Sequence, residues 1–183
     1  EAGERLTRLA HKDELLDAVI EQACGPSGLA SVQASQGLIA IGAPAVPRLM
    51  RSLTDRKDGV RARVTQVLIA LGDAALAQVI EELAAQQPDR ARRAARLLGE
   101  MQNPKGVSFL ADALSAPDSA LAREAAQALV RIGDDAAAQA LISGLARSDD
   151  VAETCAGCLG NLKHPAALPA LAARESTTTR ARS

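Results

Sequence analysis

The sequence predicts an all-α protein in which a two-helix unit recurs along the chain and stacks into a solenoid. A leucine column recurs at steps of 30 or 31 residues, and a second apolar column follows it three positions later. Hydrophobic residues form 48% of the chain and aromatics only 1%, so helix-forming alanine and leucine dominate the core, and no stretch alternates as a strand does. Self-similarity at such a period indicates a repeat architecture. The two columns are Leu38, Leu68, Leu98, Leu129, Leu159 and Ile41, Leu71, Met101, Ile132, Leu162.

Each period contains two predicted helices, which we term A and B. The A helices carry apolar residues at positions i, i+3 and i+4, which lie on one helical face. These stripes start at Leu16, Val46, Leu76, Val107, Ala138 and Leu168. The B helices end in the two apolar columns and carry a column of small residues that allows close helix packing: Ala34, Val64, Ala94, Ala125 and Cys155. Gly42, Gly72 and Gly133 are predicted to end B helices, because glycine commonly terminates a helix.

The predicted organisation is a single elongated domain over residues 1–174. Its repeats lie at about 11–42, 43–72, 73–102, 103–133 and 134–163, followed by a half-repeat at 164–174. We expect the first helix, from about Glu4, to cap the array, and Leu168 and Leu171 to pack back onto the fifth repeat. The Ser/Thr/Arg composition of residues 175–183 predicts a disordered tail.

Composition restricts the function classes. A net charge of −1 and a pI near 6.2 argue against a surface devoted to nucleic acid or to an anionic membrane. No apolar run reaches the roughly 18 residues that a membrane span needs, and the first residues lack the pattern of a secretory signal. We therefore expect a cytoplasmic protein with no membrane partner, present as a monomer or a weak dimer.

Two segments resemble the junction LGxLxxPxAV of the HEAT-repeat family, particularly the short bacterial HEAT-like repeats first named for phycobilisome lyases. They are LGEMQNPKGV at residues 98–107 and LGNLKHPAAL at residues 159–168. Pro47 and Pro169 match a proline that HEAT A helices often carry, and Asp55 with Val60 and Arg61 resembles the polar residues around the intra-repeat turn. The resemblance covers roughly residues 11–174. It implies a right-handed α-α superhelix of about five and a half two-helix repeats, and most such arrays are scaffolds or adaptors.

Metal and thiol chemistry are not expected. Resemblance to the di-iron hydroxylases built from HEAT repeats would require His-Glu pairs, but neither His11 nor His164 is followed by Glu. His164 aligns with Asn103 before a proline, which predicts a turn or capping residue. Cys155 and Cys158 have the spacing of a redox or zinc motif, yet they lie inside a predicted helix, and free cysteine behaves as a small buried hydrophobe. Unpaired cysteines fit a reducing compartment.

No catalytic residue, metal site or cofactor is predicted, since the chain lacks a Gly-rich phosphate loop and a Ser-His-Asp arrangement. The most suggestive pattern is a group of basic and amide residues on the second, third and fourth B helices, which line the concave face in similar proteins. The candidate partner-binding residues are Arg61, Arg63, Gln66, Arg92, Arg93, Arg96, Arg123 and Gln127. They predict a scaffold that binds a carboxylate-rich or phosphorylated segment of another protein. Asp149, Asp150 and Glu153 make the fifth repeat acidic, and this contrast would orient a partner.

Three alternatives stay open at this level. The arginines could form an ordinary solvated face, paired locally with Glu81, Glu82, Glu100 and Glu124. A nucleic-acid-binding protein could use an arginine-rich groove, although base stacking needs aromatic platforms and the only aromatic residue is Phe109, which we expect in the core. A relative of the chromophore lyases is suggested by the family resemblance alone.

Overall fold

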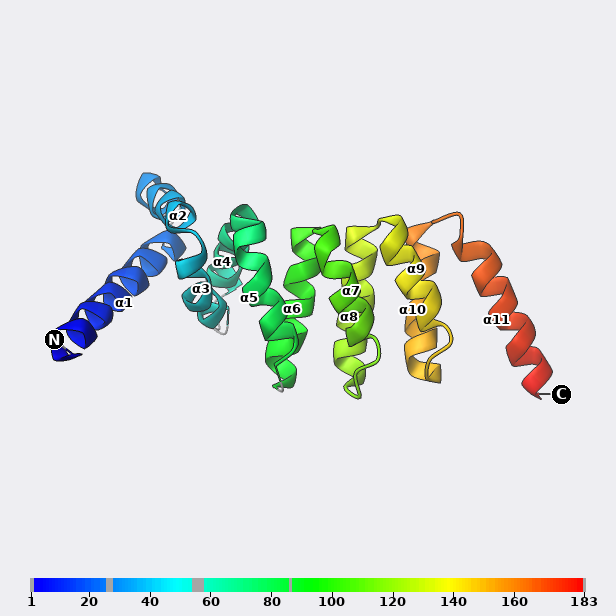
Figure 1. The fold of residues 1–183 in the computed structure, drawn as a ribbon. Coiled ribbons are helices and arrows are strands. Elements are labelled where there is room, and N and C mark those ends of the chain that lie inside the picture. Colours follow the sequence, from blue (N-terminus) through cyan, green and yellow to red (C-terminus); the bar gives the residue numbers. More distant parts are fainter. Residues whose placement is uncertain (1, 26–27, 54–57, 86, 183) are drawn as a thin grey trace. The chain divides into compact units, whose positions relative to one another are not determined.

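A computed structural model describes residues 2–25, 28–53, 58–85 and 87–182, and these residues form helices with no strand among them. The predicted loop residues 26–27 and 54–57, which include Asp55, fall outside the described ranges. Eleven α-helices follow one another along the described chain, in the predicted alternation of A and B helices (Figure 1). The all-α fold of about five and a half two-helix repeats is confirmed.

The contacts group the chain into two compact units, Glu1–Gln78 and Val79–Ser183, termed here the N-terminal and C-terminal units. The N-terminal unit holds α1 (Ala2–Cys24), α2 (Leu29–Ile41), α3 (Val46–Ser52), α4 (Asp58–Leu71) and the start of α5 (Asp73–Leu83). The C-terminal unit holds the end of α5, α6 (Pro88–Met101), α7 (Val107–Ala113), α8 (Ser119–Ile132), α9 (Asp135–Gly144), α10 (Asp149–Leu162) and α11 (Ala167–Arg182). Short 3-10 turns, Ala43–Ala45 and Pro104–Gly106, precede α3 and α7. The single continuous domain stays a prediction.

Each of the five B helices in the described chain is followed by a residue with positive φ. Gly42, Gly72 and Gly133, with φ of 74°, 55° and 70°, confirm the predicted helix ends. Gln102 and Lys163 take the equivalent positions after α6 and α10 with φ of 49° and 51°. Since side chains other than glycine are strained there, the repeat geometry imposes this turn even where the sequence lacks glycine.

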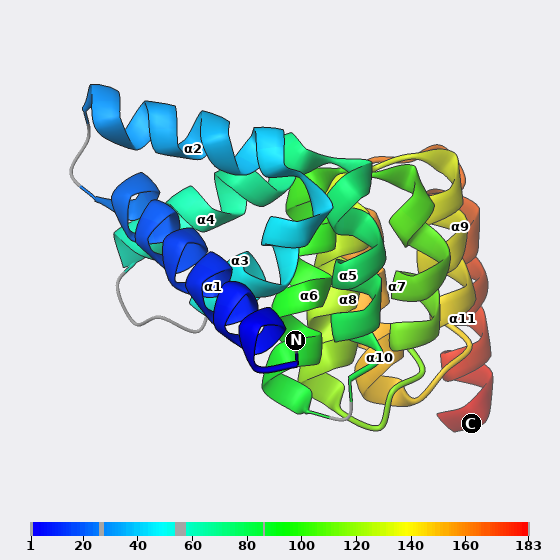
Figure 2. The same cartoon turned by 60° about the vertical axis from the view of Figure 1, so that its left-hand side comes forward.

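The core of the C-terminal unit lies where α8 packs against α6 and α10 (Figures 1 and 2). Leu98, Leu129 and Leu159 are completely buried, and the small-residue column at Ala94, Ala125 and Cys155 is buried with them. Burying each such leucine contributes about 1.5–3 kcal/mol. A β-carbon built on Gly99 would lie 2.7 Å from the Ala128 α-carbon, so α6 and α8 approach as closely as their backbones permit.

The N-terminal unit uses the same leucine column, since Leu38 and Leu68 are fully buried. Arg48 on α3 pairs with Asp13, at 2.6 Å, and with Asp17, both on α1. Hydrogen bonding to Asp17 raises the pKa of the Arg48 guanidinium. This contact joins the first two A helices, so these charges serve the fold.

Three sequence expectations differ from the structure. Phe109 is 41% exposed on α7, so its predicted core position is wrong: Val107, Leu110 and Leu114 fill the buried stripe. Leu168 is 76% exposed because Ala167 takes the buried position at the start of α11, so its predicted packing onto the fifth repeat is also wrong. Helix α11 continues through residues 175–182, where we expected disorder, because Ala172, Ala173 and Arg174 favour continued helix.

None of the individual helices in the described chain is long and apolar enough to cross a membrane, although two bent pairs, residues 29–52 and 59–83, meet the length and composition criteria jointly.

Candidate functional site

The exposed sides of α6, α8 and α10 form one polar face in the C-terminal unit. On α8 the exposed residues Ser119, Arg123, Gln127 and Arg131 recur every fourth position, as one stripe of a helix does. The repeat period aligns Arg92, Arg123 and Glu153 in one column and Arg96, Gln127 and Gly157 in the next. We call these six residues the B-helix face. The predicted candidates Arg92, Arg96, Arg123 and Gln127 therefore share one surface.

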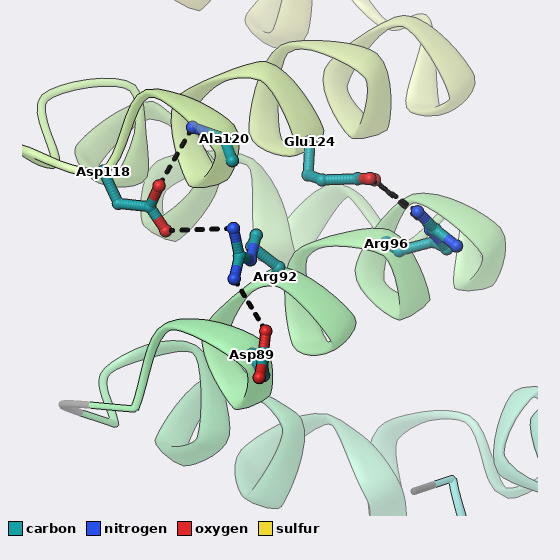
Figure 3. Close-up of polar contacts among 6 residues, drawn as sticks. All are labelled: Asp89, Arg92, Arg96, Asp118, Ala120 and Glu124. Carbon is teal, nitrogen blue, oxygen red and sulfur yellow. Dashed lines mark hydrogen bonds and ion pairs between the residues drawn. The ribbon is translucent and has the colours of Figure 1, made fainter. Parts of the chain in front are cut away.

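Arg92 is held between two carboxylates (Figure 3). Its Nη2 lies 2.6 Å from Asp89 Oδ1 on the same helix, and its Nη1 lies 3.8 Å from Asp118 Oδ2 at the start of α8. Asp118 Oδ1 accepts a hydrogen bond of 3.0 Å from the Ala120 backbone N–H and so caps α8. The charge of Arg92 is thus largely compensated within the chain, and one aspartate links the helix cap to the neighbouring repeat.

Arg96 makes a two-pronged contact with Glu124 of α8. Its Nη2 donates to Oε1 at 2.5 Å and its Nε donates to Oε2 at 3.3 Å (Figure 3). These hydrogen bonds raise the pKa of the Arg96 guanidinium. Because the Arg96 side chain is 56% exposed, the pair is expected to contribute only about 0.2–1 kcal/mol. Arg96 therefore joins two repeats while it remains accessible on the face.

Arg123 and Gln127 differ from these paired arginines. Both are exposed, and within the described part of the chain Arg123 forms no ion pair. Arg93, on α6, is half-buried and likewise has no ion pair there. Asp149, Asp150 and Glu153 on α10 are exposed and carry no ion pair within the same ranges. Among these residues, the charges without an ion pair are therefore cationic on α6 and α8 and anionic on α10.

The remaining candidates lie on α4 in the N-terminal unit. Arg61 and Gln66 are exposed. Arg63 is half-buried, and its Nη1 donates to the Ala23 carbonyl at 3.3 Å, near the end of α1. A guanidinium there satisfies a carbonyl that the helix leaves without a partner. Arg63 thus has a structural role that the sequence did not indicate.

Local pairing, the solvated-face alternative, describes part of the arginine group. Arg90 binds Glu82 at 2.5 and 2.6 Å, and Arg96 binds Glu124, so two of the predicted acidic partners are confirmed. Sequence reasoning missed Asp89 and Asp118 as partners of Arg92. A usable signal was present, because polar contacts between neighbouring repeats join residues about one period apart: Asp17 with Arg48, Arg96 with Glu124, Gln102 with the Arg131 carbonyl, and Asp135 with His164.

His164 is a capping residue, as predicted. Its Nδ1 accepts a hydrogen bond of 3.3 Å from the Ala166 N–H, as Asn103 Oδ1 accepts one of 3.0 Å from the Lys105 N–H two repeats earlier. The imidazole Nε2 lies 2.9 Å from Asp135 Oδ1. This geometry leaves Nδ1 as acceptor and Nε2 as donor, so both ring nitrogens are used in fixing the turn before α11.

The two helical cysteines are buried, as the structural interpretation of the motif predicted. Burial raises the pKa of the Cys155 thiol to about 11 and also raises the pKa of Cys158. Both therefore stay protonated near neutral pH, where a thiol is a poor nucleophile. Across the described residues, no three His, Cys, Asp or Glu side chains gather into a group that could hold a metal ion.

Comparison with known proteins adds the family. Residues 83–154 match the family model of HEAT repeats. Over these residues the chain is similar to HEAT repeats. These residues run from the end of α5 to the first turns of α10 and include most of the B-helix face, and the helix pairs outside them keep the same period. No curated protein sequence matches the chain.

Solved structures with this fold include an engineered protein, with a TM-score of 0.51 and 23% identity over 90% of this chain and 47% of that one. The complex of CpcE and CpcF of phycocyanin lyase from Nostoc sp. gives 0.47 and 22%, over 78% of this chain and 96% of that one. Human deoxyhypusine hydroxylase gives 0.48 and 19%, over 92% of each chain. The similarity to the engineered protein shows the fold alone, a helical repeat fold of HEAT or armadillo type.

Proposed function

We propose that this chain is a non-catalytic interaction scaffold that binds a segment of another protein on the B-helix face of its C-terminal unit. The observation that carries the proposal is Arg123, an exposed guanidinium with no ion pair among the described residues, one helical turn from the exposed amide of Gln127. Its neighbours Arg92 and Arg96 are each compensated by carboxylates of the chain. Among the arginines of the B-helix face, Arg123 is therefore the cation most available to a partner.

The packing beneath the face supports this role. Leu98, Leu129 and Leu159 are fully buried under the three helices, and Gly99 brings α6 and α8 into close contact. A face on rigid helices loses little conformational entropy when a segment binds, which favours affinity. A guanidinium fork suits a carboxylate or phosphate group, which can accept two parallel hydrogen bonds.

Within this proposal Arg123 and Gln127 are the first contacts and Arg93 adds a second charge. Arg92 and Arg96 contribute where an acidic group of the partner replaces Asp89 or Glu124. Arg61 and Gln66 on α4 remain candidates for further contacts. The partner is a protein with an acidic or phosphorylated segment, met in the cytoplasm by a monomer or weak dimer of this chain, without nucleic acid or membrane.

The test is a pull-down from a nuclease-treated lysate of its native cells, with quantitative mass spectrometry. The chain is compared with Arg123→Glu and with Arg147→Glu, which reverses an exposed arginine in the loop before α10. We expect a set of partners that Arg123→Glu loses and Arg147→Glu keeps, with unchanged circular dichroism for both. Equal recovery by all three forms would overturn the proposal. Partners that are recovered only when the nuclease treatment is omitted would overturn it as well.

A further inference from the structure

The B-helix face presents opposite charges in register on two adjacent helices. Arg123 on α8 and Glu153 on α10 occupy equivalent positions one repeat apart, both are exposed, and neither has an ion pair within the described residues. Asp149 and Asp150 lie one turn before Glu153 and strengthen the negative charge on α10. A partner that covers both helices thus meets a cation and then an anion.

At this repeat position, α6 differs from α8 and α10 because its charge is compensated within the chain. Arg92 occupies the same repeat position, but Asp89 and Asp118 compensate its charge at 2.6 and 3.8 Å. A purely acidic segment would therefore gain from Arg123, compete with existing carboxylates at α6, and be repelled at α10. The charge pattern favours a partner segment with both signs, because like charges placed opposite each other oppose binding.

The helix spacing restricts how far apart the partner's two charges lie. Packed helices are separated by about 8–10 Å. A polyproline II segment rises about 3.1 Å per residue and has three residues per turn, so residues i and i+3 share one side about 9 Å apart. In a β-strand, residues on one side are about 7 or 13 Å apart, which fits the column less well.

Two exposed amides, one on the B-helix face and one a helical turn beyond it on α10, also favour an extended partner. Gln127 on α8 and Asn161 on α10 are exposed, and each side chain offers both a donor and an acceptor. The backbone of a polyproline II segment has no internal hydrogen bonds, so its N–H and C=O groups are free to use such amides. A helical partner has already used its own backbone groups and could bond to these amides only through its side chains.

We propose, on the basis of the function above, that this face takes an extended segment of polyproline II type carrying one acidic and one basic side chain three residues apart. The acidic group lies over Arg123 and the basic group over Glu153. Either chain direction satisfies this pairing, so the order of the two charges in the partner's sequence is not restricted.

Synthetic peptides test the spacing directly. Fluorescently labelled proline-rich peptides with one Glu and one Lys at separations of two, three and four residues are titrated with the full chain, and anisotropy is recorded. We expect the three-residue separation to bind about tenfold more tightly than the others, and more tightly than a Glu/Glu peptide of the same spacing. Equal affinity at all separations, or tightest binding of the Glu/Glu peptide, would overturn the inference.

Charge-reversal variants test the residues. Arg123→Glu should switch the preference to a Lys/Lys peptide, Glu153→Arg should switch it to a Glu/Glu peptide, and the double swap should restore preference for the mixed peptide. Because the double variant keeps the net charge, a general loss of folding cannot imitate this pattern. An unchanged preference in either single variant would refute the assignment of that residue.

These results separate the two proposals. If Arg123→Glu removes native partners in the pull-down while the peptides show no spacing preference, the scaffold function stands and the extended-segment inference fails. A helix-forming peptide with opposite charges seven residues apart spans a similar length, about 10.5 Å. Tighter binding of that peptide would replace the extended partner by a helical one.

Discussion

Helix α2 of the N-terminal unit and the B helices of the C-terminal unit share one core pattern and differ in the side chains that they expose. In the N-terminal unit, α2 exposes large apolar side chains beside the exposed amides Gln33 and Gln36: Leu29 is 75% exposed and Val32 is 52% exposed. Val32 occupies the same repeat position as Arg92, Arg123 and Glu153 in the C-terminal unit. Beneath both surfaces the leucine column is fully buried. The repeat therefore dictates the buried column, whereas the exposed column is free to vary from one repeat to the next.

Truncating one residue of the buried column and one of the exposed column should give the largest difference in the free energy of unfolding. Leu129→Ala removes a fully buried side chain and should lower the free energy of unfolding by about 2–5 kcal/mol. Val32→Ala, at an exposed position, should change it by less than about 0.5 kcal/mol. Urea denaturation followed by circular dichroism measures both. A large loss for Val32→Ala would mean that Val32 is part of the core and would remove the distinction between the columns.

Two glycines at equivalent repeat positions sharpen the comparison. A β-carbon at Gly99 would lie 2.7 Å from the Ala128 α-carbon, whereas one at Gly160 meets nothing within 4 Å. Gly99→Ala should therefore destabilise the protein by about 1–3 kcal/mol through overpacking. Gly160→Ala should stabilise it by about 0.4–1 kcal/mol, because alanine favours the helix and restricts the unfolded chain. Thermal melting compares the two, and equal effects of the same sign would contradict the close approach of α6 and α8.

These positions illustrate how much of the fold the sequence could predict. The leucine column and the glycine helix ends were visible because a fixed period repeats the same burial and the same turn. Phe109 was misplaced because it lies one position from a buried stripe, and hydrophobicity alone does not fix the rotation of a short helix. The pairing of Arg92 with Asp118 was missed although the two residues lie roughly one period apart, because the period alone does not report which side chains reach each other.

For the candidate site, the sequence predicted which arginines and glutamines lie on B helices but not which of them are paired. It could not distinguish Arg123 from Arg96. That difference follows from one acidic residue, Glu124, whose position on α8 places it within reach of α6. Exposure and pairing are set by side-chain geometry between helices, so they emerge only from the structure.

The buried thiol in the small-residue column gives a pH-dependent prediction. Burial raises the pKa of Cys155 from 9.0 to about 11, so the folded state holds this proton more tightly than the unfolded state does. The associated stability is fully present below pH 9 and is lost as pH rises toward 11, by about 1–3 kcal/mol. Cys155→Ala is the matched control, since alanine occupies this column at Ala94 and Ala125. Urea unfolding at pH 8, 9.5 and 11 should show a steeper decline for the unmodified chain, and parallel declines would contradict the burial effect.

The smallest expected changes in the free energy of unfolding test whether the exposed arginines stabilise the fold or bind a partner. A double-mutant cycle with Arg96→Ala and Glu124→Ala should yield a coupling of about 0.2–1 kcal/mol, reduced by 1 M salt because the pair is partly exposed. Arg123→Ala, which removes no ion pair within the described residues, should change stability by less than about 0.5 kcal/mol. A cost for Arg123→Ala as large as that for Arg96→Ala would mean that the chain itself uses this guanidinium, and the face would then be a solvated surface. If Arg123→Ala leaves stability unchanged but weakens partner recovery, Arg123 contributes to binding, whereas the Arg96–Glu124 pair stabilises the fold.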